Sequence, residues 1–204
     1  MSLLQCIGWR CGAMALAGAV LLTLAAIEVL SDEPEIALHI GEPYELMRQR
    51  SSAVIGPAIP GQVSFNIPKT DARLRFLDPE YGFVTPLASF FTIIYNKEKI
   101  ISVRMSPQIE PLLLDDTLKV VLDLQDQLRN TGWTAIRLKD YPSFADTPQW
   151  RAQLRDVNKG GTSYWHAGNQ YQVMLVVGRF KDKKRPTEER YLITLALATP
   201  WTNP

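Results

Sequence analysis

The sequence predicts an α+β domain, with a largely antiparallel sheet of six to eight strands and two helices packed on one side. Three features predict this class. Short stretches rich in β-branched and aromatic residues follow one another, two longer stretches have the three-and-four spacing of amphipathic helices, and hairpin connections outnumber crossovers. We expect this domain at residues 62–204, after a membrane segment at 1–30 and a proline-rich tether at 31–61.

The chain begins with an apolar segment. Residues 11–27, CGAMALAGAVLLTLAAI, carry no charge and reach the lower limit of about 17 residues for crossing a bilayer core. Arg10 precedes this segment and no Lys or Arg follows it until Arg48, so the amino end should stay in the cytoplasm. We expect residues 11–30 to form a single-pass anchor in the bacterial inner membrane, with the C-terminal domain in the periplasm. A cleaved signal peptide and a buried soluble helix are the alternatives.

Cysteine content and charge limit the functional classes further. The only two cysteines, Cys6 and Cys11, lie at or before the apolar run, so the exported part would contain none. A domain of this size can bury enough apolar surface without disulfides. The exported part keeps 21 basic and 17 acidic residues, and its net charge of about +4 is too mild for nucleic-acid binding, which usually requires a clustered basic field. We therefore expect no nucleic-acid partner.

The segment after the anchor contains four prolines, at positions 34, 43, 57 and 60. Each proline fixes its own φ and pushes the preceding residue towards extended conformations, which disfavours a long helix and favours a flexible tether. Residues 44–48 could still form a short helical turn. The first strand is predicted at 63–67, VSFNI, where apolar and polar residues alternate. Residues 71–88 contain too many turn-forming residues to be assigned.

Two hairpins are predicted. In the first, residues 90–95 and 100–105 are rich in β-branched and aromatic side chains and flank the polar connection NKEK. In the second, residues 162–167 and 170–180 flank Gly168-Asn169, a pair that can take positive φ. This second hairpin accounts for the conspicuous stretch GGTSYWHAGNQYQ without any chemistry.

Two helices are predicted between these hairpins. An aspartate at 115 or 116 can cap the first, and Gly132 ends it. The second can be capped by residue 146 or 147, with Pro148 at the position where a missing N–H costs nothing. The predicted apolar faces are Leu118, Val121, Leu122 and Leu128 in the first helix, and Trp150, Leu154 and Val157 in the second.

Strands at 133–138 and 191–199 complete the predicted sheet. In the latter, large and smaller side chains alternate: Tyr191, Ile193, Leu195 and Leu197 against Leu192, Thr194, Ala196 and Ala198. The small residues of the second set would let a helix lie close to that face of the sheet.

The chain offers little for catalysis or metal binding. His39, in the expected tether, and His166 are the only histidines, and a lone imidazole without cysteines lacks the usual ligand set of zinc or copper. Ser163 and His166 are three residues apart on one strand, so their side chains point to opposite faces and cannot form the hydrogen bond of a triad. We expect no catalytic residue, no metal and no cofactor.

Aromatic residues are concentrated in the second half of the chain. Core packing explains them in the simplest way, because half-buried strands and amphipathic helices often carry aromatics. Alternatively, the loop at 141–150 and the strand at 164–166 expose some of them as anchors for a protein partner. The candidate anchors are Tyr141, Phe144, Trp150, Tyr164, Trp165 and His166.

The order of segments carries a family resemblance. The anchor and tether are followed by a hairpin, a helix that ends in GW at 132–133, and the strands YWHAGNQYQVMLVV and YLITLALA. This layout resembles small envelope immunity proteins of Gram-negative bacteria, which neutralise toxins delivered into the periplasm, as in type VI secretion. The likeness covers residues 90–198, and no functional residue can be carried over from it.

The resemblance implies a membrane-tethered periplasmic domain that binds a secreted antibacterial toxin and is not an enzyme. Two other classes stay open on the sequence alone. One is a non-catalytic accessory subunit of a cell-envelope or secretion assembly. The other is an unrecognised periplasmic hydrolase.

Overall fold

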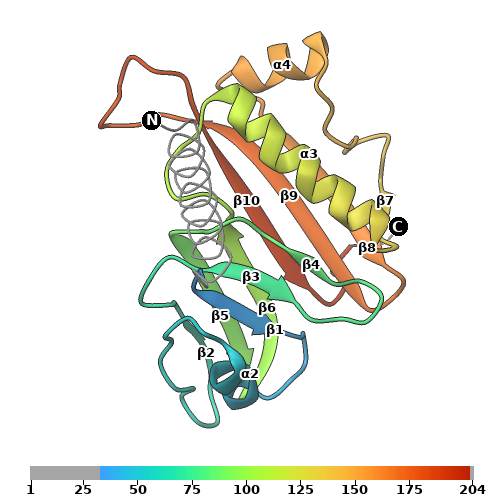
Figure 1. The fold of residues 1–204 in the computed structure, drawn as a ribbon. Helices are drawn as coiled ribbons and strands as arrows, with labels where there is room; N and C mark the ends of the chain where they lie inside the picture. Colours follow the sequence, from blue (N-terminus) through green and yellow to red (C-terminus); the bar gives the residue numbers. More distant parts are fainter. Residues whose placement is uncertain (1–32, 203–204) are drawn as a thin grey trace, which may run out of the picture. The chain divides into compact units, whose positions relative to one another are not determined.

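The computed structural model describes residues 33–202, which are coloured in Figure 1. The expected anchor at 1–30 lies outside these residues. Within the described part, no helix is both long and apolar enough to cross a membrane. The described residues form an α+β fold with a seven-stranded antiparallel sheet, a three-stranded sheet and three helices. The predicted class and the large antiparallel sheet are confirmed.

The large sheet contains seven of the ten strands in the described part of the chain. They are β2 (Val63–Asn66), β5 (Phe90–Asn96), β6 (Lys99–Ser106), β7 (Thr134–Ile136), β8 (Gly161–Ala167), β9 (Tyr171–Phe180) and β10 (Arg190–Ala198). Their order in space is β2-β5-β6-β10-β9-β8-β7, and each neighbouring pair is antiparallel. The last strand, β10, therefore joins the two predicted hairpins in the middle of the sheet (Figure 1).

The first hairpin, β5–β6, has a tighter turn than the four residues predicted. Lys97 and Glu98 take φ values of 46° and 60°, the positive-φ geometry of a two-residue type I′ turn. A bulge follows, because the register passes over Ile101. The extra residue lets both Ile100 and Val103 face the core, although they are three positions apart.

Helix α3 (Leu114–Asn130) lies over the large sheet (Figure 1). It buries Leu114, Thr117, Leu118, Val121, Leu124, Gln125 and Leu128. The predicted aspartate cap is wrong, since Leu113 occupies the N-cap and Asp115 and Asp116 lie in the first turn. Carboxylates in the first turn still stabilise the positive end of the helix. Gly132, with φ of 80°, follows the helix end as predicted.

Helix α4 (Pro148–Arg155) has the predicted start. The Thr147 side chain caps it by accepting a hydrogen bond from the backbone N–H of Trp150. Leu154 is buried against the sheet, as expected for the apolar face. Val157 was predicted on the same face but is 69% exposed, because the helix ends two residues before it.

The proline-rich segment is folded, so the tether predicted at 31–61 is wrong. β1 (Glu35–Leu38) pairs in parallel with β3 (Arg73–Phe76), and β3 pairs antiparallel with β4 (Phe83–Val84). α2 (Tyr44–Arg50) forms where a helical turn was foreseen. The compact unit begins at Pro34, and the domain boundary predicted at residue 62 moves accordingly.

The physical reason for this correction is burial. Seven side chains of the segment belong to the core: Ile36, Leu38, Ile40, Tyr44, Met47, Ala53 and Ile55. Prolines prevent one long helix, but they permit a short strand, a short helix that begins after Pro43, and extended connections.

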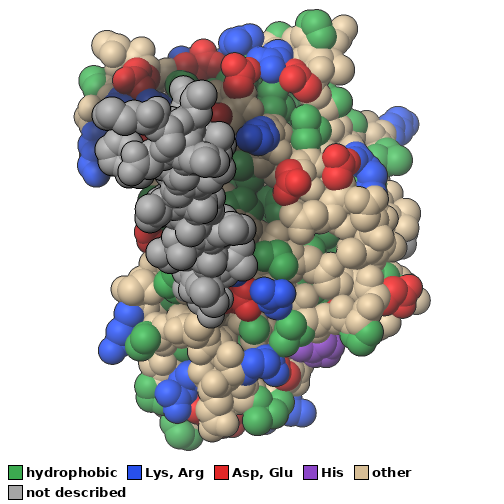
Figure 2. Space-filling view, viewed as in Figure 1, with side chains coloured by type: hydrophobic (Ala, Val, Ile, Leu, Met, Phe, Trp, Pro, Cys, Tyr) green, Lys and Arg blue, Asp and Glu red, His purple; other side chains and the backbone are tan. Residues whose placement is uncertain are grey.

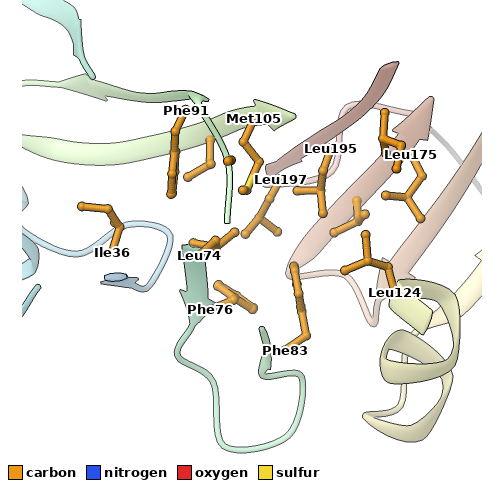
Figure 3. Close-up of a cluster of buried hydrophobic side chains, with 14 of the residues drawn as sticks. Ile36, Leu74, Phe76, Phe83, Phe91, Met105, Leu124, Leu175, Leu195 and Leu197 are labelled. Carbon is orange, nitrogen blue, oxygen red and sulfur yellow. The ribbon is translucent and has the colours of Figure 1, made fainter. Parts of the chain in front are cut away.

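One face of the large sheet carries the hydrophobic core (Figure 3). In Figure 3, side chains from the small sheet, the large sheet and α3 point toward one another; those labelled are Ile36, Leu74, Phe76, Phe83, Phe91, Met105, Leu124, Leu175, Leu195 and Leu197. Both predicted helices contribute to this core, as the prediction of packing on one side requires. The small sheet and α2 pack into the same core.

We call the opposite side of the large sheet the open face, because no described helix packs on it. Its central side chains include Thr92, Ile94, Ser102, Arg104, Met174, Val176, Leu192, Thr194, Ala196 and Ala198. The small residues of β10 therefore do not receive a described helix, contrary to the expectation. α3 and α4 instead lie on the side of the large residues, Tyr191, Ile193, Leu195 and Leu197.

Candidate functional site

Three of the six predicted anchors are buried. Phe144, Trp165 and His166 are 2%, 1% and 7% exposed. The Phe144 ring packs on Trp150 with centroids 4.8 Å apart. The backbone of Phe144 is also held by Gln125, whose side chain accepts its N–H at 2.8 Å and donates to its C=O at 2.9 Å. As exposed anchors, Phe144, Trp165 and His166 are therefore wrong, because their side chains lie inside the domain.

The other three predicted anchors, Tyr141, Trp150 and Tyr164, are partly exposed and contact neighbouring side chains. Tyr141 and Tyr164 meet edge to face with ring centroids 5.0 Å apart, and the Arg137 guanidinium lies 4.7 Å from the Tyr141 ring. Trp150 lies on α4 against Phe144. These contacts connect the loop after β7 to β8 and to α4, which is the structural role that core packing predicts.

The hypothetical Ser163–His166 pair does not form. The Ser163 hydroxyl is buried in the core and accepts a hydrogen bond from the Trp165 indole N–H at 3.1 Å. His166 points to the other face, and its Nε2 has no hydrogen-bond partner among the residues that the structure describes. Across residues 33–202, no three His, Cys, Asp or Glu side chains form a group that could hold a metal ion.

His39, which the sequence placed in the tether without partners, lies in a polar contact. Its Nε2 is 2.6 Å from the Tyr171 hydroxyl and 3.9 Å from a carboxylate oxygen of Asp78. Its ring stacks on Phe76 at 6.3 Å. Burial and the Asp78 carboxylate raise the pKa of Tyr171, so the hydroxyl stays protonated. The contact joins the segment after β1 to β9.

A hollow of about 610 Å³ lies beside the β3–β4 connection. Its polar side chains are already engaged within the domain. Arg75 pairs with Glu35, Asp78 accepts the backbone N–H groups of residues 80 and 81, and Gln127 accepts the N–H of Val84. This hollow therefore has few free groups for a ligand.

The open face carries a different kind of hollow at the end nearest β2. Val63, Phe65, Ile67 and Phe90 are 65%, 58%, 49% and 48% exposed, which is unusual for side chains of this size when they are grouped. Together with Ser64, Thr92, Ile94 and Arg104 they line a space of about 460 Å³. All of its lining residues except Arg104 are uncharged.

A second hollow, of about 340 Å³, adjoins the first towards the middle of the sheet. Its lining residues are Ile94, Ser102, Val103, Arg104, Met174, Ala196, Leu197, Ala198 and Trp201. Trp201 is 45% exposed and is held in place through its backbone. The side-chain Oε1 of Gln172 accepts the backbone N–H groups of Trp201 and Thr202 at 2.8 and 3.0 Å, and the side-chain Nε2 of Gln172 donates to the Thr202 hydroxyl at 2.7 Å.

Arg104 connects the two hollows, because it lines both and is the one charged residue among their linings. It is exposed, and no ion pair or hydrogen bond links its guanidinium to any residue in the described range. The Arg104 surface, as we define it, consists of Val63, Phe65, Ile67, Phe90, Ile94, Arg104, Met174, Ala196 and Trp201. It is the candidate functional site of the domain.

The side of the domain that carries α3 has a surface of mixed charge instead (Figure 2). Figure 2 shows the side that carries α3, where Lys and Arg lie interspersed with Asp and Glu. Many of these charges are paired; Arg151, for example, bonds both Asp115 and Asp146. An arginine without a partner among the described residues, set in an apolar surface, therefore distinguishes the open face from the side that carries α3.

Comparison with family models, with curated proteins and with solved structures produced no match. Function must therefore be inferred from the Arg104 surface together with the sequence.

Sequence reasoning missed most of this surface, although part of the signal was present. The alternation in VSFNI puts Val63, Phe65 and Ile67 on one side of a strand, and Arg104 interrupts the apolar run of β6. What the pattern could not give is which side of the strand faces the core. In the edge strand β2, the apolar side chains point to the open face and not to the core.

Proposed function

We propose that this chain is a membrane-tethered periplasmic protein-binding domain, an immunity protein that binds a secreted antibacterial toxin through the Arg104 surface. Residues 11–30 supply the inner-membrane anchor in this proposal, because they are long and apolar enough to span. Binding that occludes the toxin's active site inhibits it without any catalytic group on this side.

The Arg104 surface is the observation that carries the proposal. Tryptophan and arginine are among the residues that contribute most to protein interfaces, and Phe is enriched there. Here Phe65, Phe90, Arg104 and Trp201 share one surface with aliphatic side chains. A grouping of this kind costs solubility when it stays exposed, so a protein partner is the natural reason for it.

The scaffold under this surface favours tight binding. Most of the surface residues lie on strands that are hydrogen-bonded to neighbours, and Trp201 is held by Gln172. Side chains fixed before binding lose less conformational entropy when a partner arrives. The surface is therefore preorganised to recognise a folded protein.

A toxicity assay tests the proposal. The product of the adjacent reading frame is directed to the periplasm, where we expect it to stop growth and co-expression of this chain to restore it. Phe65→Asp combined with Trp201→Ala should abolish protection, because it removes two aromatic contacts and puts a carboxylate into the apolar hollow that Arg104 also lines. Lys119→Glu, an exposed change on α3, should protect like the wild type.

Circular dichroism and the amount of protein in the membrane fraction control for misfolding of the variants. A harmless adjacent product, or full protection by the double variant, would contradict the proposal. Crosslinks to resident envelope proteins alone would favour an accessory subunit of an envelope assembly instead.

A further inference from the structure

We infer that the partner contacts the open face with an amphipathic α-helix that lies along β6 and β10 and presents a carboxylate to Arg104. This inference rests on the proposed function and names the chemistry of the partner's contacting element. It follows from the shape of the open face and from the free charge at its centre.

The shape of the open face fits one helix. Its floor, on β6 and β10, consists of small side chains beside Arg104: Ser102, Thr194, Ala196 and Ala198. Larger side chains stand on both sides, with Phe90 and Ile94 on β5, and Met174 on β9 near Trp201. β5 and β9 are three strand spacings apart, about 14 Å, and a helix with its side chains is about 10–12 Å wide.

An extended strand added to the edge of β2 fits the charge less well. β2 is the edge strand of the sheet, and Arg104 lies two strands further in, on β6. An added strand would lie about 14 Å from β6. A carboxylate on that strand would be too far away to pair with the Arg104 guanidinium. A helix on the face passes directly over Arg104.

The charge identifies what the helix must carry. An apolar helix without an acid would bury the Arg104 guanidinium unpaired, which strongly disfavours binding. A glutamate or aspartate within the apolar side of the helix satisfies it, since the guanidinium fork matches a carboxylate with two hydrogen bonds. The occupant is therefore apolar with one acidic position, not uniformly apolar.

A second copy of the same face does not meet this requirement. The residues that line the two hollows include no carboxylate, so in two copies placed face to face these linings would supply no acid to either Arg104. Charge complementarity thus favours a different protein over self-association.

Selection from a library of displayed amphipathic helical peptides tests the inference, with the purified full-length chain in lipid nanodiscs as bait. We expect enriched peptides to carry Asp or Glu at one position of the apolar side. Binding of the best peptide should weaken at least about tenfold with Arg104→Ala. With Arg104→Glu as bait, the selected position should change to Lys or Arg.

Two further variants keep the result interpretable. Lys119→Glu makes the same charge change on the other side of the sheet and should select the same peptides as the wild type. Ala196→Trp fills the floor without altering charge and should reduce peptide binding while leaving the far-ultraviolet circular dichroism unchanged. If Arg104→Glu fails to fold, Ala196→Trp and Arg104→Ala still decide the question.

Several outcomes would overturn the inference. They are the absence of any enriched peptide, enriched peptides without an acidic position, no inversion with Arg104→Glu, or a dimer that Ala196→Trp dissociates. Its failure is separable from that of the proposed function. Protection from a toxin that persists in Arg104→Glu and Ala196→Trp would refute only the helix, whereas peptide selection without any protected toxin would refute only the immunity role.

Discussion

Individual side chains of the N-terminal part depend on partners that are distant in the sequence. His39 bonds Tyr171, 132 positions away. Glu35 accepts hydrogen bonds from Arg73 and Arg75, and the Arg75 contact lowers the pKa of the Glu35 carboxyl. Contacts of this kind hold the N-terminal part in place, and no local sequence pattern predicts them.

Tyr44 gives a pH prediction at this scale. Burial raises the pKa of Tyr44 to about 12, and its hydroxyl donates to the Gly56 carbonyl at 3.0 Å while accepting from Asn66 at 2.8 Å. Between pH 10 and 12 the folded protein keeps a proton that the unfolded chain loses. The free energy of unfolding should therefore fall by up to about 1.4 kcal/mol per pH unit from this site.

Urea denaturation at pH 8, 10 and 11 measures this effect, with Tyr44→Phe as the comparison. The variant should be less stable at pH 8 because it loses both hydrogen bonds, but its stability should fall less steeply above pH 10. A residual slope is expected, since the pKa values of Tyr171 and Tyr191 are also raised. Parallel slopes for the two proteins would count against a protonated, buried Tyr44.

At the scale of elements, the second half of the fold follows from local pattern and the first half does not. α4 has a capping threonine and a proline at its first position, and β5–β6 and β8–β9 are hairpins, so short-range rules suffice. β1 and β3 are parallel partners separated by more than 30 residues, and β4 has only two residues. Such pairing depends on tertiary contacts that a single sequence does not reveal.

From the sequence, the candidate site could be predicted only as a surface with exposed aromatic residues, and not by the residues that form it. Phe65, Phe90 and Trp165 were correctly assigned to strands, but Trp165 fills the core while Phe65 and Phe90 are exposed. Which side of a strand is buried depends on where the helices pack. Here α3 and α4 took the side of β10 with the larger residues, so the small-residue side was left for the open face.

Gln125 supplies a prediction for the junction between α3 and the loop before α4. It is fully buried and makes both hydrogen bonds to the backbone of Phe144. Gln125→Ala leaves these backbone groups unsatisfied and should lower the free energy of unfolding by about 1–3 kcal/mol. Urea denaturation measures the change.

The matched control is Gln149→Ala, because Gln149 is exposed on α4 and has no hydrogen bond from its side chain among the described residues. It should change stability by less than about 0.5 kcal/mol. Equal effects of the two substitutions would show that the Gln125 clamp does not hold the loop.

At the scale of the whole molecule, the domain has two unequal sides. One face of the large sheet carries α3, α4, α2 and the small sheet over a continuous core, whereas the other is the open face with Arg104. Within residues 33–202 no helix covers this apolar side, and an exposed apolar patch of this kind is typical of an interaction site. The contrast between the core face and the open face of the large sheet is therefore the feature that a function has to explain.

The proposed location gives a prediction at this scale. Alkaline phosphatase fused after residue 204 should be active, because the enzyme requires export, and green fluorescent protein fused there should be dark. Replacing residues 11–30 by a serine-rich segment should abolish phosphatase activity. An active phosphatase in the segment-replaced protein, or a fluorescent fusion of the intact chain, would place the domain in the cytoplasm and refute the periplasmic role.

The most direct test of the central claim, that the open face binds a partner protein, is photo-crosslinking in living cells. Benzoylphenylalanine is placed at Thr194, in the floor of the open face, or at Lys119, on the outer side of α3. We predict a discrete adduct from position 194 that is absent from position 119 and is lost with Arg104→Glu. Adducts from 119 alone, or none from 194 while toxin and chain are both present, would contradict the claim.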